Sequence, residues 1–231
     1  MRKLGRWLLW IVFAIFSFLV LLQVWYAAHI WWWRDHPPSE TAFMAMRLSE
    51  LHVKKPQARL QYVWVPYERI SNNLKKAMIA AEDAKFVEHE GFDWDGIQQA
   101  MDKNLRKGRV VAGGSTISQQ LAKNLFLSGQ RSYWRKAEEA LITVMLEAIL
   151  DKRRIFELYL NVIEWGNEVF GSEAAARHYF GIGAAELSAE QAARLAGMAP
   201  NPRHYESTPN SKGLARKVPI ILARMPSAEL P

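Results

Sequence analysis

The feature that most constrains this chain is a run of 27 residues, Trp7–Trp33, that contains no Asp, Glu, Lys or Arg. A helix needs about 20 apolar residues to cross the hydrocarbon core of a bilayer. A cleaved signal peptide has an apolar region of roughly 7–15 residues, followed by a site with small residues. This run is longer, and it ends in three tryptophans, which are typical of a membrane interface. We therefore predict an uncleaved membrane anchor.

The charges around the anchor predict its orientation. Arg2, Lys3 and Arg6 precede the apolar run, and cationic residues flanking a span stay on the cytoplasmic side. The N-terminus is therefore expected in the cytoplasm, and everything after residue 34 across the membrane. This divides the chain into residues 1–34, the cytoplasmic N-terminus and anchor, and residues 35–231, the domain on the far side.

Composition excludes several classes of protein. Half of the residues are hydrophobic, which excludes a disordered chain. The absence of cysteine excludes a disulfide scaffold, a Cys-ligated zinc site and a Cys nucleophile. The net charge is +7, and residues 1–34 carry +4 of it before Asp35. The remaining +3 is too weak an asymmetry to indicate nucleic-acid binding.

The domain after the anchor is predicted to be mostly helical. Beyond Ile70, apolar residues recur with the 3.6-residue period of a helix. Residues 60–66 are the only stretch rich in β-branched and aromatic residues, as strands are. Residues 41–52 have few charges and predict a helix that either touches lipid or packs in the core.

The first segment whose residues could take part in a reaction is Ile70–Asp95. Ser71 is a predicted N-cap, and Leu74, Ala77, Met78 and Ala81 form one apolar stripe. Glu82 lies at the edge of that stripe, where partial burial raises a carboxyl pKa and makes a proton acceptor or donor near neutral pH. The alternative is a solvated Glu near a helix end.

The second segment is Gly113–Ser128. Thr116 and Gln119 resemble a capping box, which predicts a helix start whose free amides can hold an anion. Thr116, Gln120 and Lys123 share one helix face and offer a hydroxyl, an amide and an ammonium to a sugar-phosphate. The opposite face, with Ile117, Leu121 and Leu125, is expected in the core. The alternative is an ordinary amphipathic helix with a good cap.

The third segment is Tyr133–Asn161. Leu141, Val144, Met145, Ala148 and Ile149 form one apolar face, and Leu146 and Leu150 lie opposite them. A helix that is apolar on both sides is expected in the middle of its domain. Glu139 aligns with Leu146 and so with the interior. Arg135 and Lys136 neighbour it and favour its ionised form. From these residues alone, a structural ion pair is favoured over a catalytic acid.

The fourth segment is Leu187–Tyr205. Ser188 and Gln191 form a second predicted capping box, and Gly197, Pro200 and Pro202 end the helix. We interpret this segment as structural, with Arg203 as a candidate for ligand contact.

Four motifs follow one another along the chain: EDAKFVEHEGFD, GGSTISQQLAKNLF, RKAEEA…LE…DKRRIFELYLN and LAGMAPNP. Taken together in this order, they resemble glycosyltransferase family 51 over about Trp64–Pro202. The resemblance implies a mostly α, lysozyme-like glycosyltransferase domain with a head lobe and a membrane-dipping jaw. It implies polymerisation of lipid II into β-1,4-linked peptidoglycan strands, with inversion and release of undecaprenyl pyrophosphate. The location implied is the bacterial inner membrane, with the domain in the periplasm. The implied partners are lipid II, the nascent strand and membrane lipid but no nucleic acid; other cell-wall or division proteins stay open.

The same resemblance assigns roles to residues. Glu82 is the implied general base on the acceptor 4-hydroxyl, and Glu139 helps to stabilise the departing pyrophosphate side. The residues implied to hold or surround that pyrophosphate are Lys123, Arg135, Lys136, Gln120 and Asn124. Those implied to shape the site are Asp83, Phe86, His89 and Thr116. Ser118 stands where Thr is common, and Asp151 where Ser or Thr is common. A divalent cation, Mg²⁺ or Mn²⁺, beside Glu139 stays open, since no ligand cluster demands one.

Two alternatives belong to other classes. A membrane-bound, lysozyme-like hydrolase or lytic enzyme of the cell wall also uses a Glu in a helical domain, but it has no need of the cations Lys123, Arg135 and Lys136. A non-catalytic anchored scaffold for wall assembly would tolerate the loss of both Glu82 and Glu139.

Overall fold

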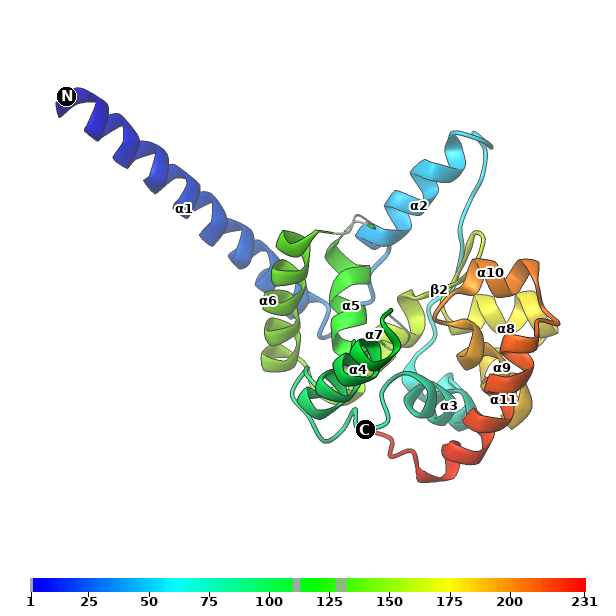
Figure 1. The fold of residues 1–231 in the computed structure, drawn as a ribbon. Coiled ribbons are helices and arrows are strands. Elements are labelled where there is room, and N and C mark those ends of the chain that lie inside the picture. The colour runs from blue at the N-terminus through cyan, green and yellow to red at the C-terminus, as the bar shows by residue number, and fades with distance from the viewer. Residues whose placement is uncertain (1, 110–112, 128, 130–131) are drawn as a thin grey trace.

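The computed structural model describes residues 2–109, 113–127, 129 and 132–231, and it leaves out the side chains of residues 2–5 and 8. Ser128, the last residue of the second predicted segment, therefore lies outside the described residues. The described part is mostly helical (Figure 1). The helices are α1 Arg2–Trp32, α2 Ala42–His52, α3 Asn72–Glu82, α4 Trp94–Lys107, α5 Ile117–Phe126, α6 Tyr133–Ile149, α7 Lys152–Val162, α8 Ser172–Phe180, α9 Ala189–Met198, α10 Pro202–Ser207 and α11 Lys212–Arg224.

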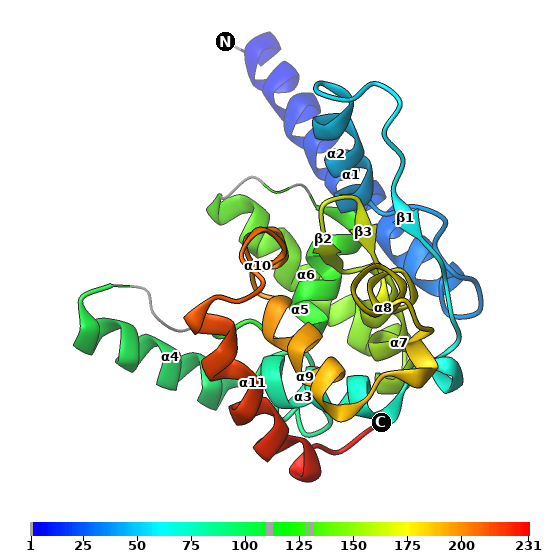
Figure 2. The same ribbon diagram turned by 90° about the vertical axis from the view of Figure 1, so that its right-hand side faces the viewer.

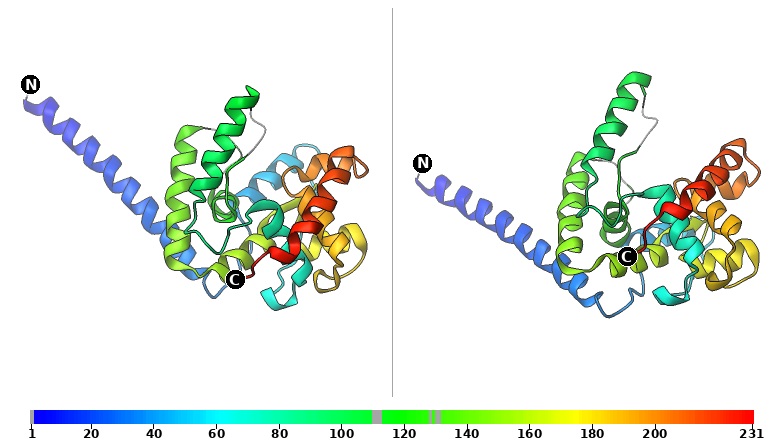
Figure 3. Two further views of the ribbon diagram at one scale, coloured as in Figure 1. Left: turned by 60° about the horizontal axis from the view of Figure 1, so that its bottom comes forward. Right: turned by 90° about the horizontal axis from the view of Figure 1, so that it is seen from below.

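Helix α1 contains the predicted anchor. Within the described residues, one helix is long and apolar enough to cross a membrane, over the 24 residues Leu9–Trp32. It extends away from the rest of the molecule (Figures 1 and 3). Its last turns differ, because Tyr26 and Ile30 are buried against the domain. The packing of the domain thus begins before residue 35.

The described body has two groups of helices that meet around α7. Helices α5, α6 and α4 lie on the side of the anchor, whereas α3, α8, α9, α10 and α11 lie on the other (Figures 1 and 2). Helix α3 packs on α9 and α11, and α5 packs on α6 and α7. In α7, Phe156, Tyr159 and Leu160 are fully buried. This arrangement brings the ends of α3 and α5 together, and with them the candidate site residues.

The predicted central position of α6 is wrong. Leu141 and Val144 are 53% and 55% exposed, whereas Ile142, Leu146 and Leu150 are buried. Helix α6 packs through this second face, mainly on α5 and α1. On the first face, Leu141 and Val144 stay exposed, whereas Met145 and Ile149 are half-buried against the core. An apolar stripe in a sequence does not show whether protein will cover it, which is why periodicity misplaced this helix.

A small sheet was only partly predicted. Strand β1 (Gln61–Tyr62) pairs in parallel with β3 (Val169–Phe170), which pairs antiparallel with β2 (Glu164–Gly166). The expected strand at 60–66 is short because the Asn161 side chain, at 3.0 and 2.9 Å, takes the backbone N–H and C=O of Val65. Strands β2 and β3 were missed, since two or three residues give no readable alternation.

Helix α2 falls between its two predicted alternatives. The Thr41 hydroxyl caps it by accepting from the Met44 N–H at 3.2 Å. Met44 is buried, and the helix packs on α5. Phe43, Met46 and Arg47 are half-buried and line a cleft, and Phe43 also packs against the core.

Candidate active site

Glu82 is the last residue of α3, and its carboxyl group faces a cleft. The Ser71 hydroxyl caps the start of this helix by accepting from Asn73 N–H at 3.1 Å, and the predicted stripe residues Leu74 and Met78 are fully buried. Burial raises the pKa of Glu82 above 4.5, opposed by a hydrogen bond from Gln120 and by the positive charges of Lys217 and Lys123. The raised pKa is the property that the sequence predicted for a proton acceptor.

A short hydrogen-bonded chain fixes Glu82. The Tyr159 hydroxyl donates to Gln120 Oε1 at 3.1 Å, and Gln120 Nε2 donates to Glu82 Oε2 at 2.8 Å. Burial raises the pKa of Tyr159 well above 10, so its phenol keeps the proton that sets the orientation of the amide. Sequence reasoning missed Tyr159. The sequence feature that could have indicated its role is a hydroxyl group on the apolar face of α7.

The N-terminus of α5 is already occupied by an anion of the protein itself. Thr116 and Gln119 form the predicted capping box. The Ile117 N–H, one of the amides expected to hold a substrate anion, donates to Asp83 Oδ2 at 3.0 Å. His89 Nε2 lies 3.0 Å from Asp83 Oδ1, and the Thr116 hydroxyl donates to the Gly91 carbonyl at 2.6 Å.

Four of the residues implied to shape the site therefore lie behind the cleft. Asp83, His89 and Thr116 join the loop after Glu82 to the start of α5. The Phe86 ring is buried, with its centroid 5.5 Å from that of Phe156. They fix the position of Glu82 relative to α5, and none of the four lines the cleft.

Glu139 is buried on α6 between two cations. Arg135 Nη1 donates to Glu139 Oε2 at 3.0 Å, and Lys136 Nζ pairs with Oε1. Both cations lie within one turn before Glu139, as their spacing predicted. All three side chains line the cleft. The cluster thus presents two positive charges to the cleft against one buried negative charge.

Lys123, on α5, is a cation without a counter-ion. Within the described part of the chain, its Nζ has no hydrogen-bond or ion-pair partner and lies 5.9 Å from the centroid of the Phe43 ring. Burial lowers the pKa of Lys123, and the nearby Glu139 opposes that shift. The next residue, Asn124, donates from Nδ2 to the Gln120 carbonyl at 2.7 Å. A half-buried ammonium without an anion is suited to binding an anionic ligand.

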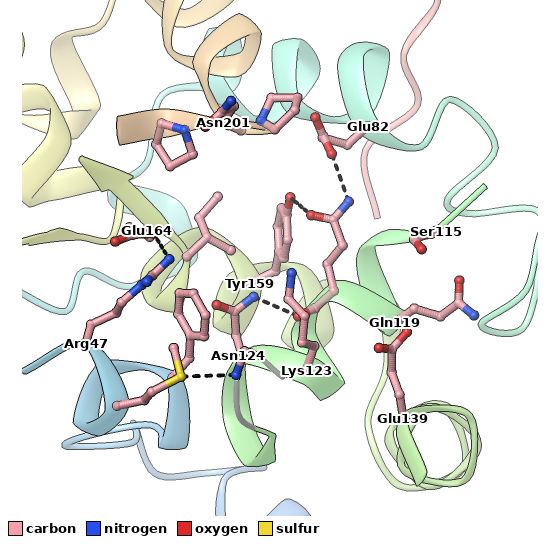
Figure 4. Close-up of a pocket in the computed structure, with 18 of the residues that line it drawn as sticks. Arg47, Glu82, Ser115, Gln119, Lys123, Asn124, Glu139, Tyr159, Glu164 and Asn201 are labelled. Carbon is pink, nitrogen blue, oxygen red and sulfur yellow. Dashed lines mark hydrogen bonds and ion pairs between the residues drawn. The ribbon is translucent and has the colours of Figure 1, made fainter. Parts of the chain in front are cut away.

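One cleft of about 900 Å³ connects these groups. Figure 4 shows Glu82 at one wall, Lys123 and Asn124 below it, and Glu139 beyond Ser115 and Gln119. In the opposite direction the cleft continues past Tyr159 to Asn201, Glu164 and Arg47. Arg203, which the sequence indicated as a candidate for ligand contact, lines this far end, but Arg47, Glu164 and Asn201 were not predicted.

The raised pKa of Glu82 predicts a pH-dependent stability difference. A carboxyl whose pKa is higher in the folded state binds more protons there, so its contribution to the free energy of unfolding falls as pH rises above 4.5. The Glu82→Gln variant lacks this penalty. We expect the thermal midpoint of the variant, relative to the unmutated protein, to increase from about pH 4.5 to neutral pH. Scanning calorimetry in detergent measures it, and a constant difference would contradict the burial of a titrating carboxyl.

The described residues combine a helix long and apolar enough to cross a membrane with a mostly helical domain, whose cleft holds a half-buried carboxyl as a candidate base and a cationic site suited to an anion. The family model for transglycosylases matches residues 49–226. The chain belongs to this transglycosylase family, which confirms the resemblance to glycosyltransferase family 51 and the lysozyme-like fold.

Relatives match the whole chain. A protein of Dechloromonas aromatica (strain RCB), named biosynthetic peptidoglycan transglycosylase, is 62% identical over 231 residues, which is 100% of both chains. Proteins of the same name from Chromobacterium violaceum and Azoarcus sp. (strain BH72) are 60% and 59% identical. The Chromobacterium match covers 99% of this chain and 100% of the relative, and the Azoarcus match covers 100% of both.

Proposed function

We propose that this protein polymerises lipid II into β-1,4-linked peptidoglycan strands and releases undecaprenyl pyrophosphate, with Glu82 as the general base. Family membership and the names of the full-length relatives support peptidoglycan glycosyl transfer. The observation that carries the residue roles is the position of Lys123. It is a half-buried cation without a protein counter-ion, in the same cleft as a carboxyl of raised pKa.

The acceptor step follows from the surroundings of Glu82. The acceptor 4-hydroxyl attacks C1 of the donor sugar and gives its proton to a Glu82 oxygen as the new C–O bond forms. A base is most effective when its pKa lies near the working pH, and burial moves Glu82 in that direction. Gln120, oriented by Tyr159, holds Oε2 and fixes the carboxylate against the hydroxyl.

The leaving-group step follows from the cations. When the bond from C1 to the phosphate oxygen breaks, negative charge grows on the pyrophosphate. Lys123, Arg135 and Lys136 stabilise that charge in place, so no strong general acid is needed. Glu139 touches Arg135 and Lys136 and holds them ready, which makes it a positioning residue for the leaving group.

The residues beside Glu139 do not fit a divalent cation. Both carboxylate oxygens accept from Arg135 or Lys136, and these two charges and Lys123 would repel a metal ion. The described residues contain no group of three or more His, Cys, Asp or Glu that could hold one.

The location proposed for the enzyme is the bacterial inner membrane, with a single span, a cytoplasmic N-terminus and a periplasmic domain. The apolar helix and the cations Arg2, Lys3 and Arg6 before it support this orientation. Other cell-wall synthesis or division proteins as partners stay a prediction. The chain has no cysteine, so a single Cys introduced at Ser39 tests the topology. A membrane-impermeant maleimide should label it in intact spheroplasts, and protection from the reagent would contradict the orientation.

The experiment that tests the function is incubation of the detergent-solubilised protein with lipid II. We expect a glycan polymer and released undecaprenyl pyrophosphate. The same sample is incubated with preformed glycan strands. Cleavage of those strands without polymer formation would instead indicate the hydrolase, and no change in either substrate would indicate the scaffold.

A further inference from the structure

The last turns of α1 belong to the folded domain, whereas most of this helix is exposed. Tyr26 and Ile30 are buried, and α1 packs on α6 at this end (Figures 1 and 3). The Tyr26 hydroxyl donates to Oε1 of Glu138 on α6. We call residues 26–36 the docked end of the anchor. A helix that only tethered the domain to the membrane would need none of these contacts.

An aromatic contact joins the docked end to α5 as well. Phe126 is the last residue of α5. The centroid of its ring lies 4.9 Å from that of Tyr26 and 5.2 Å from that of Trp33, and the Tyr26 ring meets it edge to face. Aromatic pairs at such distances add specific geometry to the burial of apolar surface. The docked end therefore contacts both α5 and α6.

The chain that leaves the anchor is held to the domain too. Arg154, on α7, donates from Nε to the Trp33 carbonyl at 2.8 Å and from Nη2 to the His36 carbonyl at 2.9 Å. Carbonyls at the end of a helix lack partners within it, and this guanidinium supplies them. The Tyr62 hydroxyl donates to the Pro38 carbonyl at 2.8 Å. These bonds tie the connection between anchor and domain, so it does not act as a free hinge.

The two helices that receive the docked end carry the cations of the cleft. Glu138 lies two residues after Lys136 on α6, and Phe126 lies three residues after Lys123 on α5. Both contacts are thus within about one helical turn of a cation. Because a short piece of helix moves as a unit, the position of the anchor and the position of the cations are linked.

The docked end also relates the domain to the membrane. The apolar span covers Leu9–Trp32, and Tyr26 lies six residues before its end. Six residues of helix measure about 9 Å, so α6 lies beside the last part of the span and not beyond it. Tyr133 and Trp134 on α6 are exposed, as aromatic residues at a membrane interface are.

We infer that the docked end of the anchor sets the height and orientation of the cleft over the bilayer, so that its cations meet the pyrophosphate of a donor still embedded in lipid. The inference rests on the proposed function. A flexible tether would raise only the local concentration of the enzyme, whereas a docked anchor also raises the fraction of molecules that face the donor correctly. The docked end precedes residue 49, where the family match begins, so family membership does not predict it.

The test moves one insertion along α1. Inserting Ala-Ala between Ile30 and Trp31 turns the side chains of Tyr26 and Ile30 by about 200° relative to the domain, which breaks their contacts. The matched control inserts Ala-Ala between Phe13 and Ala14, which are exposed, and lengthens the span equally without changing the docked end. Each full-length protein is reconstituted in liposomes. Its rate is measured with lipid II in the same bilayer and with a lipid II analogue whose short lipid chain keeps it in solution.

We expect the first insertion to lower the ratio of the bilayer rate to the solution rate about tenfold, as a fall of the correctly oriented fraction to about a tenth would. The control insertion should keep the ratio of the unmutated protein. An unchanged ratio overturns the inference, and so does an equal loss with both substrates, because that pattern indicates a purely structural contact.

Thermal unfolding checks the fold of each variant. If the first insertion prevents folding, Tyr26→Phe decides, because it removes only the hydroxyl that donates to Glu138. It should lower the same ratio by about 2–12-fold, the effect of one hydrogen bond, and an unchanged ratio would overturn the inference. If the unmutated protein polymerises neither substrate, the proposed function has failed, which is distinct from an unchanged ratio in active proteins.

Discussion

Replacing Glu82 with Gln is expected to abolish polymerisation of lipid II. The amide cannot accept the proton of the acceptor hydroxyl, and general base catalysis contributes about 100–10,000-fold. The loss in turnover should be at least of that order. Gln keeps the size of the side chain and can still accept from Gln120 Nε2, which donates to Glu82 at 2.8 Å. The measurement is a glycan polymerisation assay on the folded variant, with circular dichroism to verify the fold.

The matched control for Glu82→Gln is Glu88→Gln. Glu88 lies on the same loop as Asp83 and His89, but it does not line the cleft. We expect its activity to stay near that of the unmutated protein. Near-normal activity of Glu82→Gln would remove the general-base assignment.

Replacing Lys123 with Ala is expected to weaken both donor binding and turnover. Each charge-assisted contact to a phosphate contributes roughly 1.5–3 kcal/mol, which corresponds to about 10–150-fold. Lys123 has no protein counter-ion among the described residues, so its removal leaves no buried carboxylate unpaired. The change in donor binding therefore reports the ligand contact, whereas the change in turnover also includes the loss of a charge that lowers the pKa of Glu82. Steady-state assays with lipid II give the change in KM and kcat.

Removal of Arg135 should have an effect of similar size but a mixed cause. Arg135 also pairs with the buried Glu139, so Arg135→Ala disturbs Glu139 and Lys136 as well as the ligand. Lys103→Ala, on the exposed face of α4, serves as a control for loss of a positive charge.

For the Lys123 prediction, unchanged kinetics of Lys123→Ala would place the pyrophosphate elsewhere.

The local features of the site were predictable because each depends on a few neighbouring residues. The capping boxes at Thr116 and Ser188, the Ser71 cap and the pairing of Glu139 with Arg135 follow from spacings of two to four residues, and the structure confirms them. The apolar stripe that partly buries Glu82 follows from helical periodicity in the same way.

Features that depend on distant residues were not predictable. The Tyr159–Gln120–Glu82 chain joins three helices, and the ion pairs of Glu164 with Arg47 and Arg203 join β2 to α2 and α10. The exposure of Leu141 depends on which face of α6 other helices cover, and no local pattern encodes this. The Asp83 carboxylate at the start of α5 is a contact across 34 positions, so the helix N-terminus looked free in the sequence.

Glu82 and Glu139 have different surroundings, and this difference implies different roles. Glu82 is held by a neutral amide, and burial raises its pKa, whereas Glu139 is bound by two cations. Pairs of carboxyls in such contrasting environments take separate tasks. Glu139→Gln should therefore impair turnover through misplaced Arg135 and Lys136, while the base at Glu82 remains.

The separate roles of Glu82 and of the cations are measured most directly on one folded sample of Glu82→Gln. Binding of a lipid II analogue whose 4-hydroxyl is blocked, so that it acts only as a donor, is titrated beside turnover of lipid II. With the cations Lys123, Arg135 and Lys136 intact, the variant should bind the analogue as the unmutated protein does, and it should form no polymer. Polymer formation at a near-normal rate, or loss of analogue binding together with turnover, would contradict a division of work between the Glu82 base and the cationic pyrophosphate site.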